Sequence, residues 1–158
     1  MAVLSKKILD EIEHLASVYP ERPAILLPVL HAVQHEKGYI SEEAKVEIAE
    51  KVGVSMARVQ EVVTFYTMFH EKPVGKHLLV VCTNMTCGLM GGESLCQYLS
   101  EKLNVKPGET TQDGKFTLIR TNECLADCAH PPMMQVNERY HGCLNKEKAD
   151  RLLEELGR

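Results

Sequence analysis

Four cysteines constrain the fold of this chain more than any other feature of its sequence. Cys82 and Cys87 have four residues between them, and Cys124 and Cys128 have three. A further 36 residues separate the two pairs. Thiols placed this regularly are typical of a metal or redox centre rather than of core packing. The members of each pair are close neighbours, whereas only the tertiary fold can bring the two pairs together.

The composition indicates a protein that needs no covalent cross-links. With 158 residues, of which 44% are hydrophobic, the chain can bury a core without disulfides. Its apolar runs are too short to cross a bilayer, and residues 1–9 do not resemble a cleaved signal peptide. The sequence therefore predicts a cytoplasmic protein without direct membrane insertion, in a compartment where thiols stay reduced.

The net charge of −4 is spread evenly along the chain. Residues 1–77 and 78–158 each carry nine basic and eleven acidic side chains. Neither half forms a basic patch, which argues against nucleic acids and anionic membranes as partners.

Residues 1–72 are predicted to form a helical bundle. Pro28 lies inside the second predicted helix and favours a kink or a late start there. The last two helices resemble a helix-turn-helix, but Arg58 and Gln60 offer little to a phosphate backbone, which favours a packing or docking module. We expect the aromatic stretch 64–69 to bury the bundle against the second domain, with a surface for a partner as the second choice. The predicted helices are 5–18, 23–36, 41–52 and 55–64, with Ser5, Ser41 and Ser55 as N-caps.

Residues 73–158 are predicted to form an α/β domain, a small mixed sheet flanked by helices. The run 78–81 is continuously apolar, which is typical of a strand buried on both of its faces. Cys82 ends this strand, and Cys124 follows the next one, so both thiol pairs begin where a strand gives way to a loop. The predicted strands are 78–81, 116–121, 133–136 and 139–141. One predicted helix follows Gly92 and ends at about residue 103, and a second begins at Asn145.

Four thiolates at two strand ends suit an iron–sulfur cluster, which is commonly held by four cysteines. Irregular backbone after a strand can turn N–H groups toward sulfide and thiolate, and Gly88, Gly91 and Gly92 permit a close approach. A structural zinc site also uses four cysteines, and the spacing alone does not exclude it. A thiol–disulfide exchange centre needs two residues between its thiols, and no such pair occurs.

Other residues near the thiols are interpreted more simply. Cys96 is expected to be a small buried hydrophobic residue, and Cys143 has no assigned role. His130 is interpreted as an ordinary loop histidine. Four methionines are expected to form an apolar wall that limits water at the thiols: Met85, Met90, Met133 and Met134.

At CTNMTCGLMGG and ECLADCAHPPMM, the chain resembles the thioredoxin-like [2Fe-2S] subunit of respiratory complex I, the E subunit of NADH:quinone oxidoreductase. YIS at 39–41 and VVTFYTMF at 62–69 also look like this family, so the resemblance covers nearly the whole chain. It implies a thioredoxin-like [2Fe-2S] ferredoxin domain after the helical bundle, and one [2Fe-2S] cluster. It also implies the ligands of that cluster, which are Cys82, Cys87, Cys124 and Cys128.

Two residues depart from the family pattern. Asp127 lies between the third and fourth cysteines, where the family has small residues, and Pro131 stands where the family has alanine. A carboxylate beside the cluster disfavours an added electron. We therefore expect Asp127 to lower the reduction potential of the cluster.

The resemblance implies an electron-transfer subunit, without catalytic residues, that exchanges single electrons with the FMN- and NADH-binding flavoprotein subunit. No G-x-G-x-x-G follows a predicted strand, so nicotinamide and flavin are expected on that partner. Other peripheral-arm subunits of complex I are expected partners too, and the isolated chain can pair with itself as a homodimer. Through the complex, the chain would be peripheral to the inner membrane. The alternatives are the equivalent diaphorase subunit of an NAD-linked hydrogenase or formate dehydrogenase, and a zinc-stabilised interaction module without a redox role.

Overall fold

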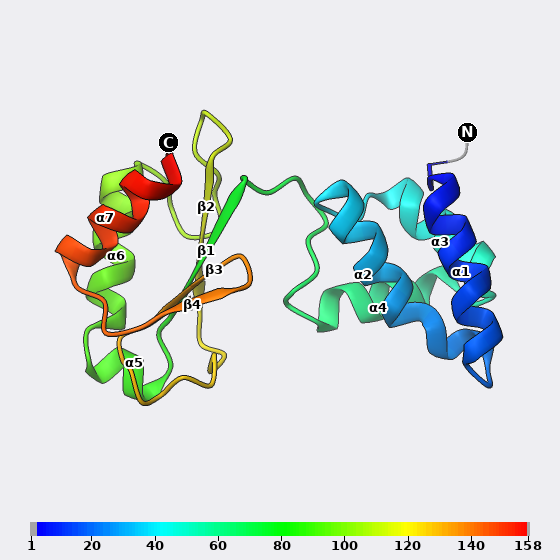
Figure 1. Cartoon of the computed structure of the whole chain (residues 1–158), viewed down its shortest axis with the longest axis horizontal. Helices are drawn as coiled ribbons and strands as arrows, with labels where there is room; N and C mark the ends of the chain where they lie inside the picture. The colour runs from blue at the N-terminus through cyan, green and yellow to red at the C-terminus, as the bar shows by residue number, and fades with distance from the viewer. Residues whose placement is uncertain (1–2, 158) are drawn as a thin grey trace. The chain divides into compact units, whose positions relative to one another are not determined.

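The computed structural model describes residues 3–157 and divides the chain into two compact units. The first unit runs to Pro73 and is helical, and the second begins at Val74 and contains the sheet (Figure 1).

The helical unit follows the predicted pattern of apolar residues closely. The hydroxyl oxygens of Ser5, Ser41 and Ser55 each accept a hydrogen bond from the backbone N–H three residues later, as expected of N-caps. A short 3₁₀-helix precedes Pro28, so the second α-helix starts late, as that proline predicted. The helices are α1 (Lys6–Val18), η1 (Arg22–Ile25), α2 (Leu26–Lys37), α3 (Glu42–Val52) and α4 (Met56–Phe65).

Within the helical unit, the aromatic stretch 64–69 is buried only in part. Phe69 is buried and packs into the core of the helical unit, whereas Phe65 and Met68 are exposed. Apolar character alone favoured burial of all three side chains. The chain leaves helical geometry at Tyr66, the C-cap of α4, and beyond this point only Phe69 turns back to the core.

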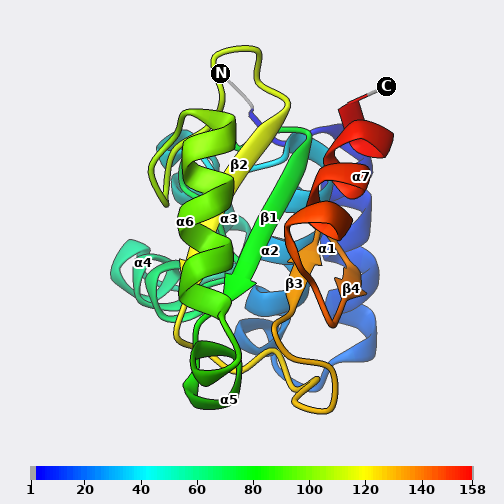
Figure 2. The same cartoon turned by 90° about the vertical axis from the view of Figure 1, so that its left-hand side faces the viewer.

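The second unit contains a mixed four-stranded sheet in the order β2-β1-β3-β4. Strand β1 pairs with β2 in parallel and with β3 in antiparallel fashion, and β3 and β4 form a hairpin. Helices α6 and α7 lie over one face of this sheet (Figure 2). The bounds are β1 (His77–Cys82), α5 (Met85–Leu89), α6 (Gly92–Leu103), β2 (Phe116–Thr121), β3 (Met134–Val136), β4 (Arg139–His141) and α7 (Lys146–Gly157).

Strand β1 is not buried on both faces, contrary to the expectation from its apolar run. Leu79 and Val81 are buried in the core beneath α6 and α7, while Leu78 and Val80 are only half-buried. Successive side chains of a strand point to opposite faces, and the helices of this unit cover one face. The run therefore alternates in burial although it does not alternate in residue type.

Within residues 3–157, no helix combines the length and the apolar character that a membrane span requires.

Candidate metal centre

The register of the sheet brings the two cysteine loops to the same edge. Cys82, the last residue of β1, is the pairing partner of Thr121, the last residue of β2. Because these strands are parallel neighbours, the chain leaves both at one edge of the sheet. Cys87 then follows in α5, and Cys124 lies in the loop just after β2. The sequence prediction that both pairs begin at strand exits is confirmed.

The thiols differ in exposure. Cys82 and Cys87 are buried in a small apolar cluster with Met133, whereas Cys124 and Cys128 are exposed. The Sγ atoms of Cys124 and Cys128 lie 3.4 Å apart. All of these thiols are free, so four unmodified sulfur donors are present at this edge of the sheet.

The thiols of the two loops influence one another electrostatically. Burial raises the pKa of the Cys87 thiol, and the neighbouring Cys82 and Cys128 thiols raise it further. The pKa of Cys128 is also raised, first by its hydrogen bond with Cys124 and also by the charge of Cys82. Cys128 therefore interacts electrostatically with both cysteines of the first pair. Several thiolates this close repel one another, so a metal centre that neutralises them favours their ionisation.

Backbone groups also form hydrogen bonds with two of these sulfurs. The N–H of Ala126 donates to the Sγ atom of Cys124 over 3.4 Å and lowers the pKa of that thiol. Ala126 has a positive φ of 64°, so the loop takes a left-handed conformation at this residue. The Met133 backbone makes a similar hydrogen bond that favours the ionised form of Cys87. Such contacts stabilise negative charge on sulfur, as expected for thiolate ligands.

The donor set fits a [2Fe-2S] cluster. In residues 3–157, no three side chains of His, Cys, Asp or Glu converge closely enough to hold one metal ion. The sulfur donors come instead as two pairs, Cys82 with Cys87 and Cys124 with Cys128, which interact within and between the pairs. Four thiolates shared between two irons are the ligand set of this type of cluster.

The structure confirms one interpretation of the remaining cysteines and leaves the other open. Cys96 is buried on α6 beside Leu95 and Leu99, as expected of a small core residue, and burial raises the pKa of its thiol. Cys143 is exposed just after β4, and nothing in the structure gives its thiol a role.

The expected apolar wall of methionines is half wrong. Met133 and Met134 are buried, but Met85 and Met90 are exposed to 78% and 58%. Helix α5 spans only Met85–Leu89, and its outer side faces solvent. The exposure of Met85 and Met90 depends on which elements pack against α5, and the sequence does not show these contacts.

A hydrogen bond beside the second thiol pair was missed by the sequence analysis. The Nδ1 atom of His130 lies 2.7 Å from the Oδ1 atom of Asp127. The spacing of three residues in a turn around Cys128 was the signal that could have found it. His130 is therefore more than an ordinary loop histidine, because it holds the Asp127 carboxylate in place.

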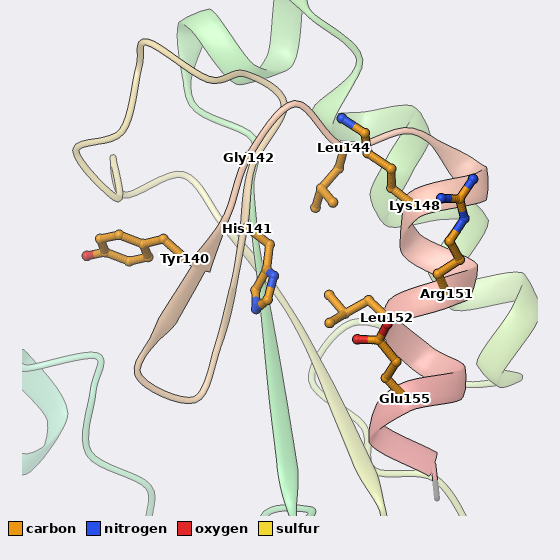
Figure 3. A pocket seen from close by; sticks show the side chains of 8 residues that line it. All are labelled: Tyr140, His141, Gly142, Leu144, Lys148, Arg151, Leu152 and Glu155. Carbon is orange, nitrogen blue, oxygen red and sulfur yellow. The ribbon is translucent and has the colours of Figure 1, made fainter.

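A separate cavity of about 430 Å³ lies between β4 and α7. Its lining includes His141, Leu144 and Leu152, whose side chains face the space between strand and helix (Figure 3). The lining of this cavity does not include the four thiols of the candidate metal centre, so the two sites are distinct.

Residues 12–157 match the model of the thioredoxin-like [2Fe-2S] ferredoxin family, and the chain belongs to this family. Membership confirms the predicted fold class and the predicted cofactor, one [2Fe-2S] cluster. Among similar curated proteins is the E 2 subunit of the NADH-quinone oxidoreductase of Rhizobium meliloti, 43% identical over 92% of this chain and 86% of the relative. NADH-quinone oxidoreductase subunit 2 of Thermus thermophilus is 40% identical over 91% of this chain and 81% of the relative. The E subunit of the Escherichia coli NADH-quinone oxidoreductase is 36% identical over 92% of this chain and 87% of the relative.

A solved structure shares the fold. A chain of an NAD+-reducing [NiFe]-hydrogenase superposes with a TM-score of 0.71 at 21% sequence identity. The match covers 84% of the present chain but only 23% of the hydrogenase chain. At this level of identity the likeness shows a common fold and nothing further.

Proposed function

We propose that the [2Fe-2S] cluster is held by the two thiol pairs, Cys82, Cys87, Cys124 and Cys128. The observation that carries this proposal is their position at one edge of the sheet, where parallel strands β1 and β2 both end. The electrostatic effects of Cys128 on Cys87 and of Cys82 on Cys128 support it, because ligands of one cluster must lie near one another.

The chain then acts as an electron-transfer subunit of NADH:quinone oxidoreductase. Three relatives that carry subunit names of this enzyme are 36–43% identical and align over at least 81% of their own lengths. The bound cluster supplies a one-electron redox couple. No side chain needs to act as an acid, base or nucleophile, and the NADH and FMN chemistry belongs to the flavoprotein subunit with which this chain exchanges electrons.

The protein residues control solvent and access. Cys82 and Cys87 are packed against Met133, which keeps water from the inner side of the cluster. Cys124 and Cys128 are exposed and mark the side that the flavoprotein subunit can approach. In this role the chain lies in the cytoplasm, on the peripheral arm of the membrane-bound complex, and its partner face can form a homodimer when the flavoprotein is absent.

The same chemistry in another assembly is the second candidate, as the diaphorase subunit of an NAD-linked hydrogenase or formate dehydrogenase. The subunit names of the relatives favour the quinone oxidoreductase. A zinc-stabilised interaction module is the candidate of a different class, and it would be colourless.

The test is anaerobic purification of the tagged chain from its native cells, with its partners attached. We expect a reddish-brown complex that contains FMN and reduces quinone. This chain should contain equal amounts of iron and acid-labile sulfide. NADH should reduce the cluster in the complex, and the isolated chain should need a chemical reductant. Stoichiometric zinc without labile sulfide would contradict the cluster, whereas a co-purifying hydrogenase or formate dehydrogenase would contradict the assembly alone.

Replacing Asp127 with asparagine should raise the reduction potential of the cluster. The substitution removes a negative charge beside Cys128 while keeping the side-chain shape, so the added electron is less strongly opposed. We expect an upward shift on the order of 60 mV, equal to a tenfold change in a one-electron equilibrium. Potentiometry followed by EPR measures it. A potential equal to or below that of the parent would contradict the predicted effect of this carboxylate.

A further inference from the structure

Gly142 lies where β4 ends and the chain turns toward α7 (Figure 3). A Cβ atom at this position would lie 2.5 Å from the Cβ atom of His130 and 2.8 Å from the carbonyl oxygen of His130. The φ of Gly142 is not in the left-handed region, so φ does not require glycine at this position. The lack of space requires glycine here, because a contact of 2.5 Å forces one of the two segments to move.

The segment that Gly142 contacts carries a proposed cluster ligand. His130 follows Cys128 by two residues, and the N–H of His130 donates to the carbonyl oxygen of Asp127 over 3.2 Å, which closes a turn around Cys128. The N–H of Cys143 donates to the carbonyl oxygen of His130 over 2.7 Å. The end of β4 and the turn around Cys128 are thus in direct contact and hydrogen-bonded.

The end of β4 is the firmer of these two segments. His141 pairs with Met134 in the sheet, and Leu144 is buried in the core beneath the helices. Cys124 and Cys128, in contrast, lie in an exposed loop. A methyl group at Gly142 should therefore displace the exposed turn, and Cys128 with it.

The first thiol pair has an equivalent contact. Gly92 is the first residue of α6, and a Cβ atom there would lie 2.5 Å from the carbonyl oxygen of Cys82 and 2.8 Å from that of Cys87. The φ of Gly92 is also outside the left-handed region. One glycine thus lets a neighbouring element press directly on the backbone of each cysteine loop.

We propose that Gly142 and Gly92 are positioning residues that set the separation of the two thiol pairs and thereby the electronic state and retention of the cluster. This inference rests on the proposed function, because it assumes that these pairs hold the [2Fe-2S] cluster. Glycine has no side chain that could bind iron, so neither residue is a ligand. Each acts through the backbone of the loop that it contacts, with Gly142 controlling Cys128 and Gly92 controlling Cys82 and Cys87.

The experiment compares G142A with the parent in the full chain, each purified anaerobically with its cluster. We expect altered EPR g-values and visible circular dichroism of the reduced and oxidised cluster. Iron should pass to a chelator about tenfold faster, the effect that supporting residues often have on metal retention. Far-UV circular dichroism records the fold separately. G92A should change the same spectra, and it serves as the test variant if G142A does not fold.

G75A is the matched control. A Cβ atom at Gly75 would lie 2.8 Å from the carbonyl carbon of Phe116, a clash of similar size, but this contact is at the start of β1 and Cys82 is at its end. We expect G75A to lower the melting temperature and leave the cluster spectra and iron release unchanged.

Unchanged spectra and iron release in G142A and G92A would overturn the proposal. An equal change in G75A would also overturn it, as would failure of both test variants to fold while G75A folds, because the role of the glycines would then be structural. A parent protein without any cluster would instead overturn the proposed function.

Discussion

Replacing Cys124 and Cys128 together with alanine is expected to leave the purified chain colourless, without stoichiometric iron or acid-labile sulfide. Two of the four proposed ligands are then absent, and the remaining buried pair cannot hold both irons. Because both replaced side chains are exposed and lie outside the sheet core, the secondary structure should persist. Visible absorption, iron and sulfide assays, and EPR of the dithionite-reduced protein measure the loss.

Cys143 supplies the control for this experiment. It is also an exposed, free cysteine, and its N–H is hydrogen-bonded to the same loop, but it is not among the proposed ligands. C143A should keep the parent's spectrum and iron content. A chromophore that survives in the double variant, or disappears in C143A, would show that the ligand set has been assigned wrongly.

The second large effect is expected in the helical unit, at Lys45. This side chain is fully buried, and its Nζ atom lies 2.7 Å from the Oε1 atom of Glu42 and 2.8 Å from that of Gln60, and it also contacts the carboxylate of Glu71. Lys45→Ala removes a buried aliphatic stem and leaves these acceptors without their donor. We expect the free energy of unfolding to fall by about 2–4 kcal/mol, as for other large-to-small core substitutions, in urea denaturation followed by far-UV circular dichroism.

Lys45→Met separates packing from charge in the same position. It keeps most of the volume, and the side chain of Glu71 is 38% exposed, so loss of the screened ion pair should cost roughly 1 kcal/mol or less. If Lys45→Met were as destabilising as Lys45→Ala, packing of the stem would not be the main contribution. If neither variant were destabilised, the buried position of Lys45 would be contradicted.

The ionisation of Glu71 determines how the difference in unfolding free energy between the parent and Lys45→Met depends on pH. Hydrogen bonds from Lys45 and Gln60 lower the pKa of Glu71 in the folded chain. A carboxylate with a lowered folded pKa contributes stability above its unfolded pKa, near 4.3, and loses it as the pH falls through the folded value. The gap in unfolding free energy between the parent and Lys45→Met should therefore be present at neutral pH and narrow in acid.

Local features of the sequence predicted most of the secondary structure and located the thiols. Serine caps and helical spacing identified the helices because these signals act within one or two turns. The alternation of strands and helices likewise indicated a mixed sheet. The positions of Cys82 and Cys124 after predicted strands placed both pairs at strand exits.

Contacts between distant residues could not be predicted in this way. The exposure of Met85 and Phe65 and the alternating burial of β1 depend on which neighbours cover each face. The contact of Gly142 with His130 joins residues that are brought together only by the β3–β4 hairpin. The sequence shows a glycine and a histidine at these positions, but not that they touch.

The parallel pairing of β1 with β2 has a consequence for biogenesis. The two proposed ligand pairs have 36 residues between them, so β1 must pair with β2 before all four thiols lie at the same edge of the sheet. A slip of one residue in this pairing would shift one cysteine pair relative to the other by about 3.3 Å along the strand. Iron and sulfide would thus meet all four proposed ligands together only on a polypeptide whose sheet has already assembled in register.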